Sequence, residues 1–208
     1  MAIQINGNGT ITGISVGGLP DGIVDTDMIA ANAVATAKLA DGAVTSTKST
    51  GLGGLSMMDQ WRNNVDNGET NNSTISGWER VDTLFSQIGT GMTESSGVFT
   101  FPATGIYKVE FHASWRRAAN QNLNKVRGQI YVSSDGGSNY TSRCEASTQM
   151  ASAGDNQECF CCGNCILDVT DASQFKVKLY VEAATHVRPM QSTNQNITYF
   201  TFLKLGDT

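Results

Sequence analysis

Apolar and polar residues alternate along several stretches of the chain from residue 57 onward. The clearest stretch is residues 106–115, where one set of alternate positions is apolar: Tyr107, Val109, Phe111, Ala113 and Trp115. The positions between them carry Lys108, Glu110, His112 and Ser114. A period of two indicates a strand with one buried face. Weaker runs of the same kind predict strands at 97–101, 126–132, 175–181 and 197–205.

Turn-forming sequences separate the predicted strands. They are Asp-Asn-Gly at 66–68, Pro-Ala-Thr-Gly at 102–105, Asp-Gly-Gly at 135–137 and Asp-Ala-Ser at 171–173. Many short strands with such turns, and no convincing helix, indicate an all-β sandwich of roughly 150 residues. We therefore predict one domain over 57–208. Its predicted core contains Phe99, Phe101, Tyr107, Val109, Phe111 and Trp115.

The N-terminal quarter follows a different pattern. Residues 1–20 alternate Ile and Val with glycine, and hold too few large side chains for a core of their own. Residues 21–50 repeat with a period of ten, as DGIVDTDMIA, ANAVATAKLA and DGAVTSTKST. The segment GLGGLS at 51–56 is predicted to be a glycine hinge between this repeat and the domain that follows.

The ten-residue repeat cannot bury its apolar side chains alone, because each unit is too short. We expect several chains to lie side by side and to share these side chains along a common axis as a stalk. The positions are Val24, Ile29, Val34, Leu39 and Val44. The sequence leaves open whether the stalk is a β-spiral or a series of short helical turns. A flexible low-complexity linker is the alternative interpretation of 21–50.

Four segments of the predicted domain resemble the jelly rolls of the complement globular heads and of tumour necrosis factor. GVFTFPATGIYKVEFHASW (97–115) is similar to the most specific family signature. VRGQIYVSSDGGSNY (126–140), SQFKVKLYVEA (173–183) and ITYFTFLKLGD (197–207) follow in the family's order, although Thr201 stands where the family usually has glycine. The resemblance implies a tight homotrimer with an aromatic seam along its threefold axis and partner-binding loops.

The repeat carries a second resemblance. AVATAKLADGAVTSTK is similar to the stalk repeats of bacteriophage tail fibres, particularly those of marine phages. Both resemblances imply the same trimer. Together they imply a structural virion protein whose residues 1–20 attach it to other virion proteins. The C-terminal knob would then bind a host surface glycan or outer-membrane protein through its loops. Alternatives are a capsid decoration or tail adaptor without a receptor role and, less favoured, a short glycan depolymerase.

Composition and charge narrow the class of partner. The net charge is −5 and the 14 Lys and Arg are scattered, which argues against nucleic acid. The densest basic spot is Trp115-Arg116-Arg117. No apolar run approaches the roughly 18 residues that span a bilayer, and the start MAIQINGNGT lacks the features of a secretory signal. We therefore expect a protein made in the host cytoplasm and incorporated in the virion, with no membrane insertion.

Four of the five cysteines lie in ECFCCGNC at 158–165. Cys162-x-x-Cys165 has the ligand spacing of a zinc knuckle. The alternative metal site is Cys159, Cys161, Cys162 and Cys165, with Cys144 as a further ligand. A second ligand pair is missing, and Ile166-Leu167 continue an apolar run. We favour buried structural thiols that bind no metal, and disulfides formed after cell lysis are a further alternative.

No catalytic motif is visible in the sequence. His112 is expected to hydrogen-bond a neighbouring strand or protomer, and His186 to lie in a loop. Neither is flanked by a nucleophile or metalloprotease motif. The carboxylates Asp155, Glu158, Asp168, Asp171 and Glu182 are expected in solvated turns, and their spacing selects no acid pair. We predict no enzyme and no cofactor.

Overall fold

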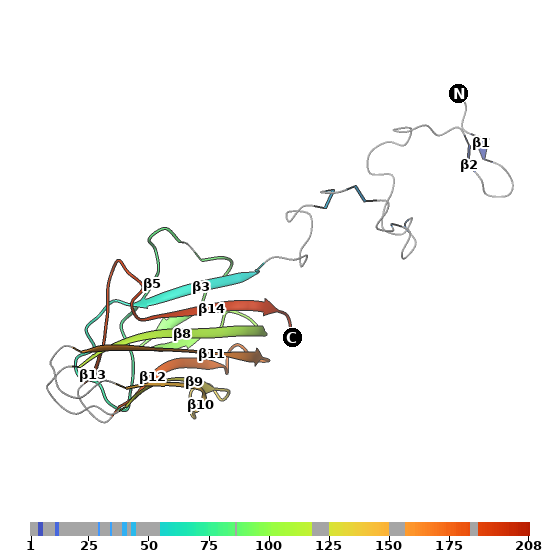
Figure 1. The fold of residues 1–208 in the computed structure, drawn as a ribbon. Helices are drawn as coiled ribbons and strands as arrows, with labels where there is room; N and C mark the ends of the chain where they lie inside the picture. Colours follow the sequence, from blue (N-terminus) through green and yellow to red (C-terminus); the bar gives the residue numbers. More distant parts are fainter. Residues whose placement is uncertain are drawn as a thin grey trace. The chain divides into compact units, whose positions relative to one another are not determined.

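The computed structural model describes residues 55–85, 87–117, 125–149, 157–183 and 187–208, together with a few short pieces of the N-terminal region. The chain divides into two units, Met1–Leu52 and Gly53–Thr208. The division falls within the glycine-rich segment 51–56. Each unit is considered by itself (Figure 1).

In the N-terminal unit, β1 (Gln4–Ile5) pairs with β2 (Ile11–Thr12) in antiparallel register. Of the five stalk-packing residues, Ile29, Val34, Leu39 and Val44 are exposed in the single chain, and Val24 lies outside the described residues. Packing between chains at these positions therefore stays a prediction.

The C-terminal unit is a sandwich of two antiparallel sheets, and none of its described residues is helical (Figure 1). The first sheet, which we call the β8 sheet, has the strand order β11-β8-β14-β3-β5, with β13 also paired to β8. Its strands are β3 (Met57–Asn63), β5 (Trp78–Arg80), β8 (Gly105–Arg117), β11 (Glu158–Val169), β13 (Val187–Pro189) and β14 (Tyr199–Gly206).

The second sheet, the β9 sheet, has the order β10-β9-β12-β7-β6, with β4 paired to β12. Its strands are β4 (Ser73–Thr74), β6 (Thr93–Ser95), β7 (Val98–Thr100), β9 (Val126–Ser133), β10 (Thr141–Thr148) and β12 (Lys176–Ala183). Across the part of the chain that the structure describes, no helix is long and apolar enough to cross a membrane.

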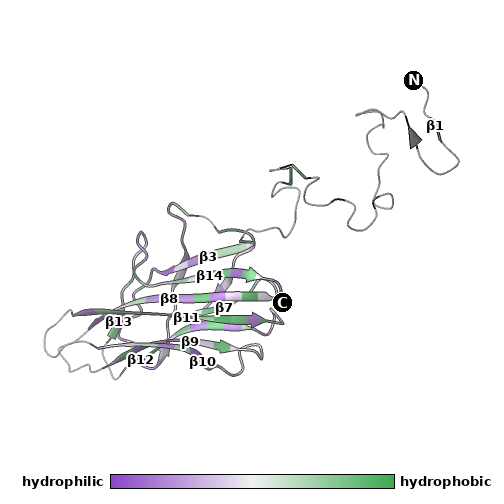
Figure 2. Ribbon diagram, turned by 45° about the vertical axis from the view of Figure 1, so that its right-hand side comes forward, coloured by the Kyte–Doolittle hydropathy of each residue, from purple (hydrophilic) through white to green (hydrophobic). Residues whose placement is uncertain are grey.

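The alternation along β8 places every second side chain between the sheets. Green and purple alternate along this strand in Figure 2. Tyr107, Val109, Phe111, Ala113 and Trp115 are all fully buried. Phe99 and Phe101, at the end of the preceding hairpin, are buried with them. The six core residues expected from the sequence thus all lie in the observed core.

Aromatic rings from both sheets meet at the centre of the core. Phe99 lies 5.1 Å from Phe202 and 5.5 Å from both Phe200 and Trp61 between ring centroids. Trp78 closes the cluster at 5.7 Å from Phe99. Edge and tilted contacts of this kind stabilise a core beyond the burial of apolar area. Because Phe99 comes from the β9 sheet and the other four come from the β8 sheet or its edge, the cluster holds the two layers together.

A buried carboxylate lies beside this cluster. Asp59 has no exposed surface, although it lies on β3. Its oxygens accept hydrogen bonds from Trp61 Nε1 at 2.9 Å, Arg80 Nε at 3.0 Å and the Met92 backbone N–H at 2.8 Å. A buried charge is tolerated when it is paired and hydrogen-bonded in this way. Asp59 therefore joins the β8 sheet to Met92, the residue directly before β6 of the β9 sheet.

Candidate functional site

Three rings stack across the outer face of the β8 sheet. His112 of β8 pairs with Tyr199 of β14 and, on its other side, with Cys162 of β11. The His112 ring is 5.2 Å from Tyr199 and 5.5 Å from Phe160, with interplanar angles of 6° and 8°. His112 thus makes ring contacts on this face, whereas the sequence led us to expect a hydrogen bond. His186 lies outside the described residues.

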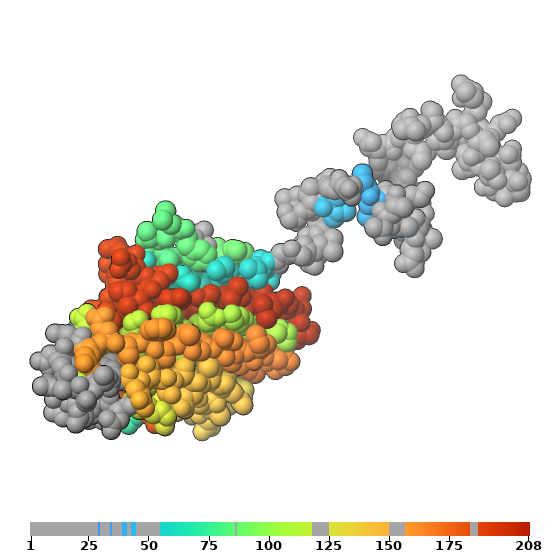
Figure 3. Space-filling view, in the orientation of Figure 1, coloured from blue at the N-terminus to red at the C-terminus, as the bar shows by residue number. Residues whose placement is uncertain are grey.

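Two large apolar side chains of β11, Phe160 and Ile166, are exposed on this same face. Among the described residues of the sandwich strands, three large hydrophobic residues are exposed, namely Phe160 (63%), Ile166 (55%) and Leu205 (54%). All three belong to β11 or β14. Figure 3 shows these strands with β8 and β3 as adjacent bands across the surface. Large apolar side chains grouped on one side of a sandwich mark an interaction surface.

The cysteines of β11 divide between the two faces of the strand. Cys161 is buried, Cys159 and Cys165 are half-buried, and Cys162 is exposed. The expected buried thiols are therefore wrong for Cys162, and Ile166 likewise lies outside the core. The physical reason is that β11, like every strand of a two-sheet sandwich, packs only one face against the other sheet, so alternate residues must point outward.

The inward thiols lie in apolar surroundings. Trp115 Nε1 donates a hydrogen bond to Cys161 Sγ at 3.3 Å. Burial raises the pKa of Cys159 to about 11 and that of Cys165 also to about 11. Buried thiols with raised pKa values are poor nucleophiles and poor metal ligands, because both roles need the thiolate.

Cys144 of β10 does reach β11, where the sequence suggested that it could act as a further metal ligand. Its Sγ lies 2.5 Å from where a Cβ would stand on Gly163. Among the residues that the structure describes, however, no three His, Cys, Asp or Glu side chains are grouped so as to hold a metal ion. The cysteines on β11 thus line the junction between the edges of the two sheets.

The carboxylates that we expected in turns are mostly in strands. Glu158 and Asp168 belong to β11 and Glu182 to β12, so that expectation is wrong for these three. Asp171 does lie in a turn, where Ser173 donates hydrogen bonds that lower its pKa. Asp155 lies outside the described residues.

Asp135 lies in the loop between β9 and β10 and accepts hydrogen bonds from residues of that loop and from the end of β9. Hydrogen bonds from the Ser133 hydroxyl, at 2.6 Å, and from Asn139 lower its pKa to about 2. A catalytic acid needs the opposite shift, toward neutral pH. Asp135 is therefore suited to holding the loop between β9 and β10.

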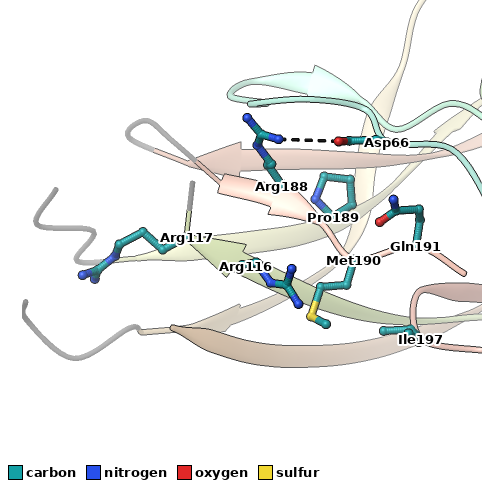
Figure 4. A pocket seen from close by; sticks show the side chains of 8 residues that line it. All are labelled: Asp66, Arg116, Arg117, Arg188, Pro189, Met190, Gln191 and Ile197. Atoms are coloured by element: carbon teal, nitrogen blue, oxygen red, sulfur yellow. Dashed lines mark hydrogen bonds and ion pairs between the residues drawn. The ribbon is translucent and has the colours of Figure 1, made fainter. Parts of the chain in front are cut away.

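A cavity of about 530 Å³ lies at one end of the sandwich (Figure 4). Its lining comes from the ends of β3, β8 and β13 and from the residues before β14: Asp66, Arg116, Arg117, Arg188, Pro189, Met190, Gln191 and Ile197. The chain enters the domain at the opposite end, where Met57 of β3 pairs with Lys204 of β14. The cavity is thus placed at the end remote from the N-terminal connection.

Charged side chains make up half of the lining of this cavity. Arg188 lies near Asp66, with 3.5 Å between Nη1 and Oδ2, and Arg116 points toward Met190 and Ile197 (Figure 4). The guanidinium group of Arg117 extends away from the other labelled side chains, and Arg117 is buried. The sequence singled out Arg116 and Arg117 but not Arg188, because only the pairing of β13 with β8 brings Arg188 beside them.

The sequence matches no family model and no curated protein. Among solved structures, it is similar to the tumour necrosis factor Eiger of S. frugiperda, with a TM-score of 0.55 and 11% identity. That likeness covers 73% of this chain and 94% of the other. Murine APRIL at pH 5.0 gives a TM-score of 0.51 and 13% identity, over 72% of this chain and 98% of that one. At these identities the likeness establishes the fold, a tumour-necrosis-factor-like jelly roll.

Proposed function

We propose that this protein is a homotrimeric virion fibre without enzymatic activity, whose jelly-roll head binds the host cell surface. The observation that carries the trimer is the outer face of the β8 sheet. Phe160, His112 and Tyr199 form a continuous ring stack there, and Ile166 is a further exposed apolar side chain on this face. A second copy is the occupant that fits best, because a repeated stalk joined to the head brings identical heads together.

The fibre role rests on the sequence of the N-terminal unit. The ten-residue repeat needs neighbouring chains, and it resembles phage stalk repeats. Residues 1–20 would attach the trimer to other virion proteins. Recognition is assigned to the head because the described cavity lies at the end remote from the connection to the stalk. The ligand on the host is a surface glycan or an outer-membrane protein.

Deletion of residues 1–20 tests the assignment of roles to the two units. We expect the shortened chain to bind host cells as well as the full chain does, and to be absent from assembled particles. Flow cytometry of labelled protein on host cells measures binding, and immunoblotting of purified particles measures incorporation. Loss of cell binding on this deletion would move recognition to the N-terminus. Failure of the full chain to bind cells would remove the receptor role and leave a decoration or adaptor protein.

A further inference from the structure

Leu84, between β5 and β6, is a fully exposed leucine in a backbone conformation that leucine rarely adopts. Its relative exposure is 104% and its φ is 59°. In this left-handed region the Cβ atom lies too close to the following carbonyl oxygen. Residues under such strain persist where the surrounding structure fixes them, and they cluster at binding and switch sites. A single exposed leucine is ordinary, but here the backbone is strained while the side chain faces water.

Hydrogen bonds to β3 hold the chain just before Leu84. The Val81 backbone N–H donates to the Gln60 carbonyl oxygen at 2.9 Å. Asp82 accepts a hydrogen bond from Nη2 of the buried Arg62 at 2.7 Å. Leu84 therefore follows an anchored segment at the β3–β5 edge of the β8 sheet.

A small hollow lies at the opposite edge of the same sheet. Its volume is about 230 Å³, and it is lined by Ser114, Glu158, Cys159, Phe160, Met190 and Ile197. Four of these six residues are apolar. Phe160 is 63% exposed, and Met190 and Ile197 are half-buried. The hollow thus offers an apolar wall that is open to solvent and has room for one large apolar side chain.

Leu84 and the hollow cannot meet within one chain. The strand order β11-β8-β14-β3-β5 puts them at opposite edges of the sheet. Four strand spacings separate these edges, which is about 19 Å. A closed threefold ring needs two such different surfaces on each chain, because each copy contacts one neighbour with one surface and the other neighbour with the second.

The two features also lie at similar levels along the strands. Arg62, which is hydrogen-bonded to the segment before Leu84, lies in line with His112 across the sheet. Phe160 pairs with Ser114, the next residue after His112 on the outer face of β8. Rotation about an axis that runs along the strands keeps each residue at its level. Such a rotation therefore brings Leu84 of one copy near the hollow of the next.

We infer that Leu84 of each chain inserts into the hollow beside Phe160 of the neighbouring chain. Burial of a leucine side chain from water in this contact favours assembly. The strained backbone at Leu84 keeps the side chain outside its own core and available to the neighbour. This inference rests on the proposed trimer, since it names the residues through which the copies meet.

Leu84→Asp tests the contact in the full chain. It should raise the concentration at which half of the trimer has dissociated by about tenfold or more, because it places a charge in an apolar hollow. Fluorescence-detected sedimentation from micromolar to nanomolar concentration measures this value. Thr90→Asp is the matched control, since Thr90 is also exposed between β5 and β6. Equal dissociation of Leu84→Asp and wild type would overturn the inference while the trimer stands, whereas a monomeric wild type would remove both.

A disulfide between copies tests which surface Leu84 contacts. After oxidation with diamide, the full chain with Leu84→Cys and Glu158→Cys should give covalent trimers on denaturing, non-reducing gels. Glu158 lines the hollow without forming its apolar wall. The matched control combines Leu84→Cys with Ser147→Cys on β10, and wild type gives the background from the native cysteines. No covalent trimer above this background, from a chain that sediments as a trimer, would contradict the contact.

Leu84→Gly separates this contact from a role in the fold of the single chain. Glycine adopts a positive φ without strain, so the substitution removes the side chain and relieves the backbone. In a monomeric Phe160→Glu background, the denaturant midpoint should not fall. In the otherwise unchanged chain, trimer dissociation should shift in the same direction as for Leu84→Asp. A lower midpoint in the monomer with unchanged dissociation of the trimer would show that Leu84 serves only its own chain.

Discussion

Phe111 is the residue on which the packing of the two sheets depends most directly. Its ring is fully buried, and glycines in both sheets make room for it. A Cβ on Gly128 of β9 would lie 2.6 Å from Phe111 Cε2, and one on Gly163 of β11 would lie 2.9 Å from Cε1. The alternation around Phe111 predicted its burial. The role of the two glycines could not be predicted, because it depends on contacts between strands far apart in the sequence.

Truncation of Phe111 tests this packing. Phe111→Ala should lower the free energy of unfolding by about 3–5 kcal/mol, because it opens a cavity against backbone that cannot collapse onto it. Glu110→Ala is the matched control, since Glu110 points outward beside Lys108, and a surface change of this kind costs about 0.5 kcal/mol or less. Denaturant unfolding of both variants measures the difference. A severe Glu110→Ala and a neutral Phe111→Ala would show that the register is shifted by one residue.

The half-buried thiols make stability depend on alkaline pH. Burial raises the pKa of Cys159 and of Cys165 from 9.0 to about 11. The folded state therefore holds these protons more tightly than the unfolded state does, and the resulting stability is present below pH 9. It is lost as the pH rises from about 9 to about 11. Denaturant unfolding should show a steeper loss over this range for wild type than for the Cys159→Ser/Cys165→Ser variant. Parallel pH profiles would contradict the burial of these thiols.

At the scale of elements, the alternation along β11 predicts which residues share a face of the strand but not which face is buried. A period of two correctly separates Cys159 and Cys161 from Phe160 and Cys162. The alternation cannot show that Phe160 and Cys162 face outward, because both sets of residues are apolar. That choice is made by the register with β8, which sets Cys161 opposite the buried Ala113 and directs Phe160 onto His112.

Charge placed on the outer face of β11 tests its role in assembly. Phe160→Glu and Ile166→Glu should each shift the full chain toward monomer, because three added carboxylates would face one another in the trimer. Ser147→Glu is the matched control, since Ser147 is exposed on β10 of the other sheet. Size-exclusion chromatography with light scattering gives the mass of each variant. A trimer that survives both β11 changes would place the interface elsewhere.

The position of Arg188 of β13 beside Arg116 of β8 could not be predicted from the sequence. Arg116 was visible as part of the densest basic spot, but two adjacent arginines on a strand point to opposite faces. The arginine that lies beside Arg116 is Arg188, and only the antiparallel pairing of β13 with β8 places it there. A three-residue strand such as β13 carries no periodic signal strong enough to predict.

At the scale of the whole molecule, the head was predictable because its strands are regular and its signature around Gly105 and Tyr107 is specific. Thr201, which departs from the family pattern, is accommodated: it is buried and accepts a hydrogen bond from Gln60 Nε2 at 3.0 Å. The N-terminal repeat was predictable only as a pattern of residues. Of its described apolar residues, Ile29, Val34, Leu39 and Val44 are exposed in the single chain, so the conformation of the stalk stays a prediction.

Sedimentation equilibrium of the full chain at micromolar concentration tests the central claim, that the chain assembles as a trimer through the stalk and the β8 outer face. We expect a single species with three times the chain mass of 22.2 kDa. This species should persist on dilution, because the stalk and the head both hold the three chains together. A stable, compact monomer at that concentration would rule out the trimer and, with it, the fibre role.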